Sequence, residues 1–228
     1  PPSPPFSPPP PPLSPPPPLP PYEPLQPVFE ALEEFTLDGS TCYYASEGSS
    51  AALPTGTEPY AIEADIKPAS VACSNNGGIV GWGNYGSANS VNAFRLGNGC
   101  RQIKNYWWGA DLHTPALPIG SALNDGSWHR VTAEFDGTTR KLSIDGGTVA
   151  TDTPTGGAAA SNVNFCVGKT NFASDGTEYF TGSMKGVRIW NVGGIPLSPP
   201  SPPSPPPSPQ PPPSPPPPPS PPSHPSPP

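Results

Sequence analysis

The chain has 228 residues, of which 45 are proline, and a formal net charge of −7. Because binding to phosphates needs a basic surface, this acidic balance argues against a nucleic-acid partner and against an anionic membrane surface. No run of roughly 18 apolar residues is present, so we expect no membrane-spanning segment.

The prolines divide the chain into three parts. Residues 1–27 contain 17 prolines, residues 28–195 contain 6, and residues 196–228 contain 22, while every Lys and Arg lies in the middle part. The middle part is long enough for one well-covered core. The chain begins and ends inside proline repeats, which predicts that it is a piece of a longer, processed polypeptide.

The flanking segments 1–27 and 196–228 are predicted to form polyproline II, because proline lacks an amide donor and has a fixed φ. Their Ser-Pro-Pro units resemble the hydroxyproline-rich glycoproteins of plant and green-algal cell walls, of the extensin-like and volvocine kinds. The resemblance implies hydroxylation and O-glycosylation, at positions such as Ser198, Pro199, Pro200, Ser201, Pro202, Pro203 and Ser204. The alternative is an unmodified ligand for SH3, WW or profilin-like domains, but no Lys or Arg flanks the repeats.

The middle part is taken next in chain order. A short helix over residues 30–34 is marginal on its own. Strands are predicted at residues 35–37, 42–44, 60–68, 79–83, 91–96 and 102–108, the last two forming a hairpin around 97–99. Residues 115–124 are predicted to be a loop.

Alternation with a period of two marks the remaining strands. Val131, Ala133 and Phe135 alternate with polar residues, and so do Leu142 with Ile144 and Val187 with Ile189. Asp-Gly turns at 136–137 and 145–146 predict hairpins. Each strand has one apolar face that must be covered, which predicts an all-β sandwich of two antiparallel sheets over residues 28–195.

The middle part resembles the laminin-G-like branch of the concanavalin-A-like lectin/glucanase superfamily. The resemblance is carried, in the family's order, by residues 37–39, 60–68, 125–131, 142–146, 167–168 and 180–191. It implies a jelly roll with its two ends close together and a role in binding carbohydrate or protein. It also makes Asp111, and secondarily Asp175, a candidate ligand of a calcium ion at the rim, although single Asp residues in such loops mostly form turns. No other cofactor is expected.

Four cysteines, Cys42, Cys73, Cys100 and Cys166, match no zinc spacing. An even number in a Ser/Pro-rich chain favours two disulfides. Of the three pairings we prefer Cys73–Cys100 with Cys42–Cys166; the alternative is four buried free thiols.

Catalytic signals are weak. Glucanases of this superfamily carry Glu-x-Asp-x-x-Glu, and Glu63 and Asp65 begin that pattern, but its third carboxylate position is Pro68. His113 and His129 are the only histidines of the middle part, and no Ser-His-Asp arrangement is indicated. We therefore expect no catalytic residues and no enzyme.

The stronger signal is for binding. Sugar recognition uses flat aromatic faces together with planar amide and charged groups. The candidate binding residues are Asn84, Tyr85, Asn92, Arg95, Asn105, Tyr106, Trp107 and Trp108. Adjacent residues of a strand point to opposite faces, so one of Trp107 and Trp108 is expected in the core and the other outside. The alternative places both in the core.

Together these features predict a secreted structural glycoprotein of a cell wall, extracellular matrix or ciliary surface fibre. Its sandwich would bind glycans or neighbouring proline-rich glycoprotein chains in a fibrous homo- or hetero-assembly. The alternative is a carbohydrate-binding lectin with proline-rich spacers. A glycan hydrolase is a third hypothesis, which the missing third carboxylate of the motif disfavours.

Overall fold

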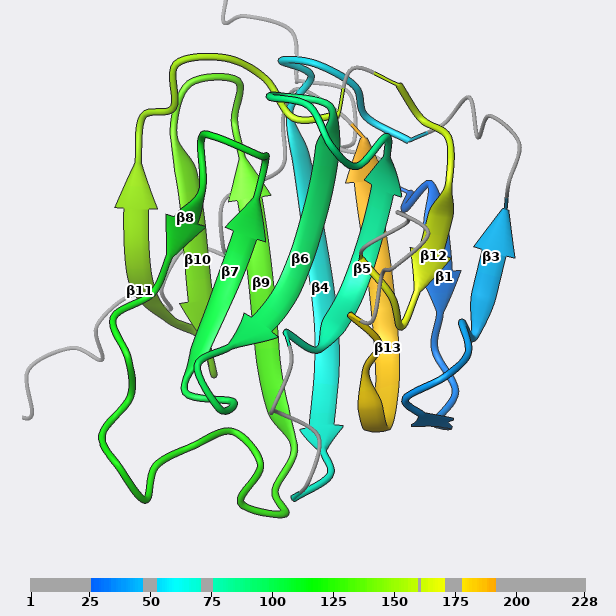
Figure 1. The fold of residues 1–228 in the computed structure, drawn as a ribbon, viewed down its shortest axis with the longest axis vertical. Coiled ribbons are helices and arrows are strands. Elements are labelled where there is room, and N and C mark those ends of the chain that lie inside the picture. The colour runs from blue at the N-terminus through cyan, green and yellow to red at the C-terminus, as the bar shows by residue number, and fades with distance from the viewer. Residues whose placement is uncertain (1–25, 47–52, 71–75, 160, 171–177, 192–228) are drawn as a thin grey trace, which may run out of the picture. The chain divides into compact units, whose positions relative to one another are not determined.

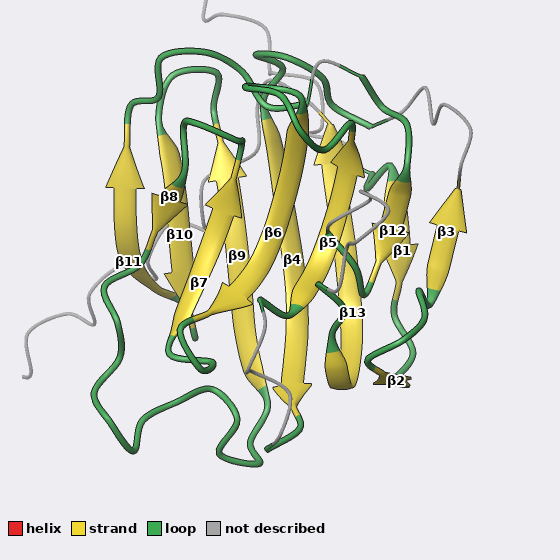
Figure 2. Ribbon diagram, in the orientation of Figure 1, coloured by secondary structure: helices red, strands yellow, loops and turns green. Residues whose placement is uncertain are grey.

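A computed structural model describes residues 26–46, 53–70, 76–159, 161–170 and 178–191. Strands β1 to β13 form two antiparallel sheets that face each other (Figures 1 and 2). The described residues contain no helix, and hence none that could cross a membrane. The prediction of an all-β jelly-roll sandwich is confirmed.

Sheet A has seven strands in the order β1-β13-β4-β9-β10-β11, with β2 also paired to β13. Its strands are β1 (Phe29–Ala31), β2 (Phe35–Asp38), β4 (Tyr60–Pro68), β9 (His129–Phe135), β10 (Arg140–Ile144), β11 (Gly147–Asp152) and β13 (Thr181–Asn191). The start of β13 pairs with β2 and its end with β1. The first and last described strands are therefore neighbours, as the resemblance implied.

Sheet B has six strands in the order β3-β12-β5-β6-β7-β8. Its strands are β3 (Tyr44–Ser46), β5 (Gly78–Gly83), β6 (Val91–Gly97), β7 (Gln102–Tyr106), β8 (Leu112–His113) and β12 (Phe165–Val167). The outer face of β5 is covered: a Cβ on Gly78 would lie 2.5 Å from the Thr170 nitrogen and the Glu178 carbonyl oxygen. Glycine at this position therefore lets the chain around Thr170 and Glu178 lie directly on the sheet.

The period-two patterns decide which side chains enter the core. In β9, Val131, Ala133 and Phe135 are buried while the residues between them lie on the outer face. The β9–β10 turn is closed by the Asp136 carboxylate, which accepts the amides of Thr138 and Thr139. The largest apolar side chains of the core are Tyr60, Ile62, Ile66, Ile79, Trp82, Phe94, Leu96, Ile103, Trp107 and Phe180.

Several local expectations are corrected. The helix over residues 30–34 is wrong, because Phe29–Ala31 is strand β1 and pairs with β13. A marginal local helix cannot compete with hydrogen bonds to an established sheet. The strand predicted at 42–44 begins only at Tyr44, whereas the hairpin predicted at the 145–146 turn is present and joins β10 to β11.

The predicted disulfide Cys42–Cys166 is confirmed and joins residues 124 positions apart. It ties the chain preceding β3 to β12 at one edge of sheet B. Cys100 is also disulfide-bonded. Its expected partner Cys73 lies outside the described residues.

His129, at the start of β9, lies between two carboxylates of sheet A. Its Nδ1 is 2.9 Å from Asp145 Oδ2, and its Nε2 is 3.2 Å from Asp125 Oδ1. Burial lowers the pKa of His129, but the hydrogen bonds with Asp145 and Asp125 outweigh burial, so that the pKa is raised above its usual value. The same Asp145 side chain accepts the Arg130 amide at 2.9 Å and so joins the β10–β11 turn to β9.

This arrangement predicts a pH dependence of stability. A raised folded-state pKa contributes stability that is complete below the ordinary histidine pKa and is lost as pH rises through the raised one. The part of the free energy of unfolding that His129 contributes should fall between mildly acidic and mildly alkaline pH, measured as the difference between the wild type and His129→Gln in urea unfolding of the full chain.

His129→Gln should remove this part of the dependence, because glutamine does not titrate. His113 has a lowered pKa and therefore contributes a pH dependence of opposite sign. Because the wild type and His129→Gln both contain His113, its contribution cancels in the difference between them. Equal slopes for the wild type and His129→Gln would contradict the assignment.

Candidate functional site

Alternation along β6 and β7 separates the predicted binding residues into two groups. Asn92 and Asn105 are fully buried between the sheets. Arg95 and Tyr106 occupy the opposite parity on the same strands and face outward. The expectation of one cluster is therefore corrected, because residues of opposite parity lie on opposite faces of a sheet.

Three rings gather on the outer face of sheet B, and we call Tyr85, Tyr106 and Trp108 the ring cluster. Tyr85 and Tyr106 stack with centroids 5.7 Å apart and planes 15° apart. Trp108 meets Tyr85 edge-on at 4.9 Å and Tyr106 at 6.0 Å. The three rings are partly exposed, so they form an aromatic surface supported from below by sheet B.

Arg95 anchors the ring cluster. Its guanidinium lies 4.1 Å from the centre of the Tyr106 ring, and its Nη1 donates to the Tyr85 hydroxyl at 3.0 Å. It also forms an ion pair with Glu178, and both side chains are nearly buried. Thr170 donates to the same Glu178 carboxylate at 3.0 Å. The ion pair between Arg95 and Glu178 thus holds the rings of the cluster in place.

Trp108 adopts a backbone conformation that is unusual for its size, with φ of 56°. This left-handed conformation is held by the amide of Asn89, which is 3.0 Å from the Trp107 carbonyl oxygen and 3.3 Å from that of Trp108. A bulky residue at positive φ is strained. The strain is tolerated here where it turns the Trp108 ring out to the ring cluster.

Both tyrosines of the ring cluster remain protonated at neutral pH. Burial, more than any other cause, raises the pKa of the Tyr85 hydroxyl far above its ordinary value. Burial, and then the charge of Asp111, raises the pKa of Tyr106. Each hydroxyl can therefore donate a hydrogen bond as well as accept one.

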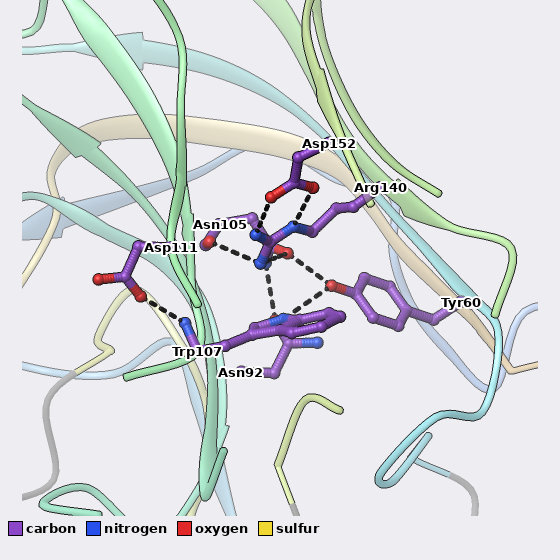
Figure 3. Close-up of polar contacts among 7 residues, drawn as sticks. All are labelled: Tyr60, Asn92, Asn105, Trp107, Asp111, Arg140 and Asp152. Carbon is purple, nitrogen blue, oxygen red and sulfur yellow. Dashed lines mark hydrogen bonds and ion pairs between the residues drawn. The ribbon is translucent and has the colours of Figure 1, made fainter. Parts of the chain in front are cut away.

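The inward group belongs to a buried polar network, which Figure 3 shows. The Tyr60 hydroxyl donates to Asn105 Oδ1 at 2.6 Å, and the Trp107 indole donates to the Tyr60 hydroxyl at 3.1 Å. Asn105 Nδ2 donates to Asn92 Oδ1 at 2.8 Å. Burial raises the pKa of Tyr60 to about 12. These groups bind one another and do not face solvent, while the Asn92 Nδ2 donor has no hydrogen-bond partner among the described residues.

A buried cation completes the network. Arg140 of β10 is fully buried, and its guanidinium lies 4.2 Å from the centre of the Trp107 ring. It donates to both carboxylate oxygens of Asp152, at 3.1 and 2.7 Å, and to the Asn105 carbonyl oxygen at 3.1 Å. Because Arg140 and Asp152 come from sheet A and Asn105 from sheet B, the network joins the two layers.

The remaining predicted residue, Asn84, lies outside both groups. It is exposed after β5, donates to Ser161 Oγ at 3.3 Å and accepts from Asn164 Nδ2 at 3.3 Å. The strand predicted over 102–108 ends at Tyr106, so strand alternation does not orient Trp107 and Trp108. Trp107 lies in the core and Trp108 outside, as expected, but the left-handed conformation of Trp108 is what separates them.

A family model described as the concanavalin A-like lectin/glucanases superfamily matches residues 38–196. The chain belongs to this superfamily. The comparison with curated proteins found no match.

Solved members of the fold superpose on most of the chain. Domains LG4-5 of the mouse laminin alpha1 chain match with a TM-score of 0.50 and 19% identity, over 70% of this chain and 41% of that one. CBM40 of the Ruminococcus gnavus IT-sialidase, bound to alpha2,6-sialyllactose, gives 0.53 and 17%, over 72% and 93%. The NanB sialidase of Streptococcus pneumoniae, as its K499G mutant, gives 0.54 and 18%, over 76% and 29%. The chain thus spans less than half of the laminin structure, and these likenesses concern the fold.

The partial glucanase motif lies on sheet A, whereas the ring cluster lies on sheet B. Glu63 and Asp65 project from the outer face of β4 in sheet A. Glu63 pairs with Arg188 at 3.0 Å, and Asp65 pairs with Arg130 at 2.8 Å. The two carboxylates are therefore engaged in cross-strand ion pairs, on the face opposite to that of the ring cluster.

Of the two calcium ligands implied by the resemblance, the structure describes Asp111. Asp111 accepts the Trp107 amide at 2.9 Å and so closes the turn after β7. Within the described ranges, no three His, Cys, Asp or Glu side chains converge in a way that could hold a metal ion. Asp175, the second candidate, lies outside the described residues.

Three charged residues of the two groups were not predicted: Glu178, Arg140 and Asp152. The sequence held a signal for Arg140, because it has the same parity as Leu142 and Ile144, which face the core. No local pattern identifies Glu178, which reaches Arg95 from 83 positions away.

The buried cation predicts a large loss of stability when its carboxylate is removed. Asp152→Ala leaves the Arg140 charge uncompensated. Breaking a buried pair costs about 3–5 kcal/mol, and the lower end applies because 32% of the Asp152 side chain is exposed. Urea unfolding of the full chain measures the change.

Glu30→Ala is the matched control, since it removes a carboxylate from Arg188, an arginine that keeps Glu63. That change should stay within about 0.5 kcal/mol, as for other exposed pairs. Similar losses in the two variants would show that Arg140 needs no buried partner.

Proposed function

We propose that the sandwich is a non-catalytic glycan-binding module within a secreted, hydroxyproline-rich structural glycoprotein. The observation that carries the proposal is the ring cluster on the outer face of sheet B, with Arg95 and Glu178 beneath it. Exposed aromatic faces can pack on the C–H side of a sugar, and hydroxyl and charged planar groups can pair with sugar hydroxyls.

The strained backbone at Trp108 supports a binding role. Non-glycine residues in the left-handed region cost of order 1–3 kcal/mol and concentrate at functional sites. At Trp108 the conformation places a large ring beside Tyr85 and Tyr106. Asparagine or glycine would adopt it at lower cost, so the presence of tryptophan points to the ring as the reason.

The fold likeness to a sugar-bound module supports the same class by analogy. The CBM40 domain of the Ruminococcus gnavus IT-sialidase is bound to alpha2,6-sialyllactose and spans nearly the same fold as this chain. A shared fold does not transfer a ligand, because functions differ between sites grafted on one scaffold. The argument for this chain therefore depends on its own ring cluster.

A binding role without catalysis is favoured by the state of the carboxylates. Retaining and inverting glycosidases need two carboxyl groups that flank the sugar. Here Glu63 and Asp65 are each held by an arginine of sheet A. Glu178, the carboxylate nearest the ring cluster, is held by Arg95.

The setting is proposed from the composition of segments 1–27 and 196–228, of which the structure describes only residues 26 and 27. Hydroxylated, O-glycosylated proline rods would space the sandwich from its neighbours in a cell wall, matrix or ciliary surface fibre. The Cys42–Cys166 disulfide fits an extracellular compartment. The partners would be glycans or neighbouring proline-rich chains.

The ring cluster also favours a second candidate, a lectin in which the rods are only spacers. Filaments that form only when residues 1–27 and 196–228 are present would favour the structural role. Tight binding of a soluble oligosaccharide, with no filaments under any condition, would favour the lectin.

Removing one ring should abolish most binding. We expect Tyr106→Ala to lower the affinity for the glycans that the full chain binds on an array by roughly tenfold, equivalent to about 1.4 kcal/mol. Trp108→Asn should do the same while the fold is kept, because asparagine tolerates the left-handed conformation. Affinities are measured by titration calorimetry, and folding by urea unfolding.

Trp128→Ala is the control, because Trp128 is a partly exposed ring on sheet A, packed between Lys67 and Lys185. It should leave glycan affinity unchanged, and none of the proteins should release reducing ends from bound glycans. Release of reducing ends that is lost in Glu63→Ala would establish a hydrolase and refute the proposal.

The proline-rich segments give a separate prediction. Mass spectrometry of the native secreted protein should find hydroxyproline with pentose or hexose ladders on peptides that contain Ser198 to Ser204. We expect no N-linked glycan, because the chain has no Asn-x-Ser/Thr site. Unmodified proline-rich peptides would exclude the cell-wall type of glycoprotein.

A further inference from the structure

Three basic side chains form a row across the outer face of sheet B, beside the ring cluster. Arg95 of β6 is the register partner of Lys104 in β7, and Lys104 is the partner of His113 in β8. Like charges placed opposite each other across strands destabilise a sheet. A group that compensates the row is therefore expected nearby.

The nearby carboxylates are occupied by other groups. Glu178 is bound by Arg95, and Asp111 accepts the Trp107 amide. The ion pairs formed among the described residues do not include Lys104. Of the row's two permanent cations, Arg95 has an ion-pair partner among the described residues and Lys104 has none there.

Gly97 provides the place where the Lys104 side chain lies. A Cβ on Gly97 would be 2.8 Å from Lys104 Nζ, and the end of the lysine stem would be closer still. The lysine therefore crosses from β7 to lie against the β6 backbone. Its ammonium is held at the surface of the sheet, where an approaching ligand can reach it.

The protonation of the row agrees with this geometry. Burial lowers the pKa of Lys104, and the charge of Arg95 lowers it further, against the opposing effects of Glu178 and Asp111. Burial, and then Lys104, lowers the pKa of His113, which is consequently neutral at neutral pH. An anion bound at Lys104 would relieve an ammonium that the protein itself undercompensates.

We propose that the ring cluster takes an acidic saccharide, whose carboxylate or sulfate group binds Lys104 while a sugar ring packs on Tyr106. This inference rests on the proposed glycan-binding function and specifies its ligand class. Lys104 and Tyr106 face the same side of β7, and the ammonium lies at Gly97, the register partner of Gln102, four positions or roughly 13 Å along the strand from Tyr106. An oligosaccharide with one unit on the rings can therefore present the acid group of a later unit to the ammonium.

The test compares an oligosaccharide of a hexuronic acid with its methyl ester, which lacks the charge but keeps the sugar. Calorimetry of the full chain at low ionic strength should show a preference for the acid of roughly tenfold, in line with a charge-assisted hydrogen bond. Lys104→Gln should abolish the preference and leave the ester affinity unchanged. An oligosaccharide that carries sulfate groups but no carboxylate tests whether sulfate can supply the anion.

Two further variants separate position from charge. Gly97→Ala keeps the lysine but fills the space where its ammonium lies, so the preference should shrink. Alanine fits the backbone there, because Gly97 is not among the residues of positive φ. Lys185→Gln removes the same charge from sheet A, beside Trp128, and should keep the full preference.

The two levels of the proposal fail differently. Equal affinities for acid, ester and sulfated sugar in the wild type, with Tyr106→Ala still weakening all of them, would overturn the acidic-ligand inference and leave glycan binding in place. Failure of every glycan to bind the wild-type chain would overturn the proposed function itself. An acid preference that survives Lys104→Gln but not Lys185→Gln would place the anion at Lys185 on sheet A and overturn the inference.

Discussion

The guanidinium of Arg140 lies fully buried between the two sheets, and much of the surrounding structure follows from the need to compensate it. An unpaired charge in an apolar interior is prohibitively costly. Asp152 supplies the opposite charge from the neighbouring strand of sheet A, while the Asn105 carbonyl and the Trp107 ring supply contacts from sheet B. These directional contacts hold β10 against β7, whereas apolar packing alone would tolerate a small slide between the layers.

The buried network also reaches the surface, because Trp107 and Trp108 are consecutive. The first ring is fixed in the core by Tyr60 and Arg140, and the Asp111 carboxylate holds its amide. The next residue is turned into the left-handed region, so its ring lies outside with Tyr85 and Tyr106. Core and candidate site therefore share one rigid connection, and the aromatic surface is preorganised for a ligand.

The two outer faces of the sandwich differ in how their aromatic rings are arranged. On sheet A, carboxylates meet cations across the strands, and Lys67 and Lys185 lie over the single ring of Trp128. On sheet B, three partly exposed rings contact one another beside Lys104, which no described carboxylate pairs with. Several rings offer a sugar a larger flat surface than one ring does, and for this reason the proposed binding site is on sheet B.

Alternation and turn residues were enough to predict an all-β sandwich, strand β4 and the β6–β7 hairpin, and the even number of cysteines led to Cys42–Cys166 as a preferred disulfide. These features depend on local periodicity and on pairing rules that a sequence displays directly. The tertiary structure alone decided that residues 29–31 join a sheet edge and that Glu178 meets Arg95. Each of these outcomes depends on which distant strand becomes the neighbour, and sequence separation carries no information about that choice.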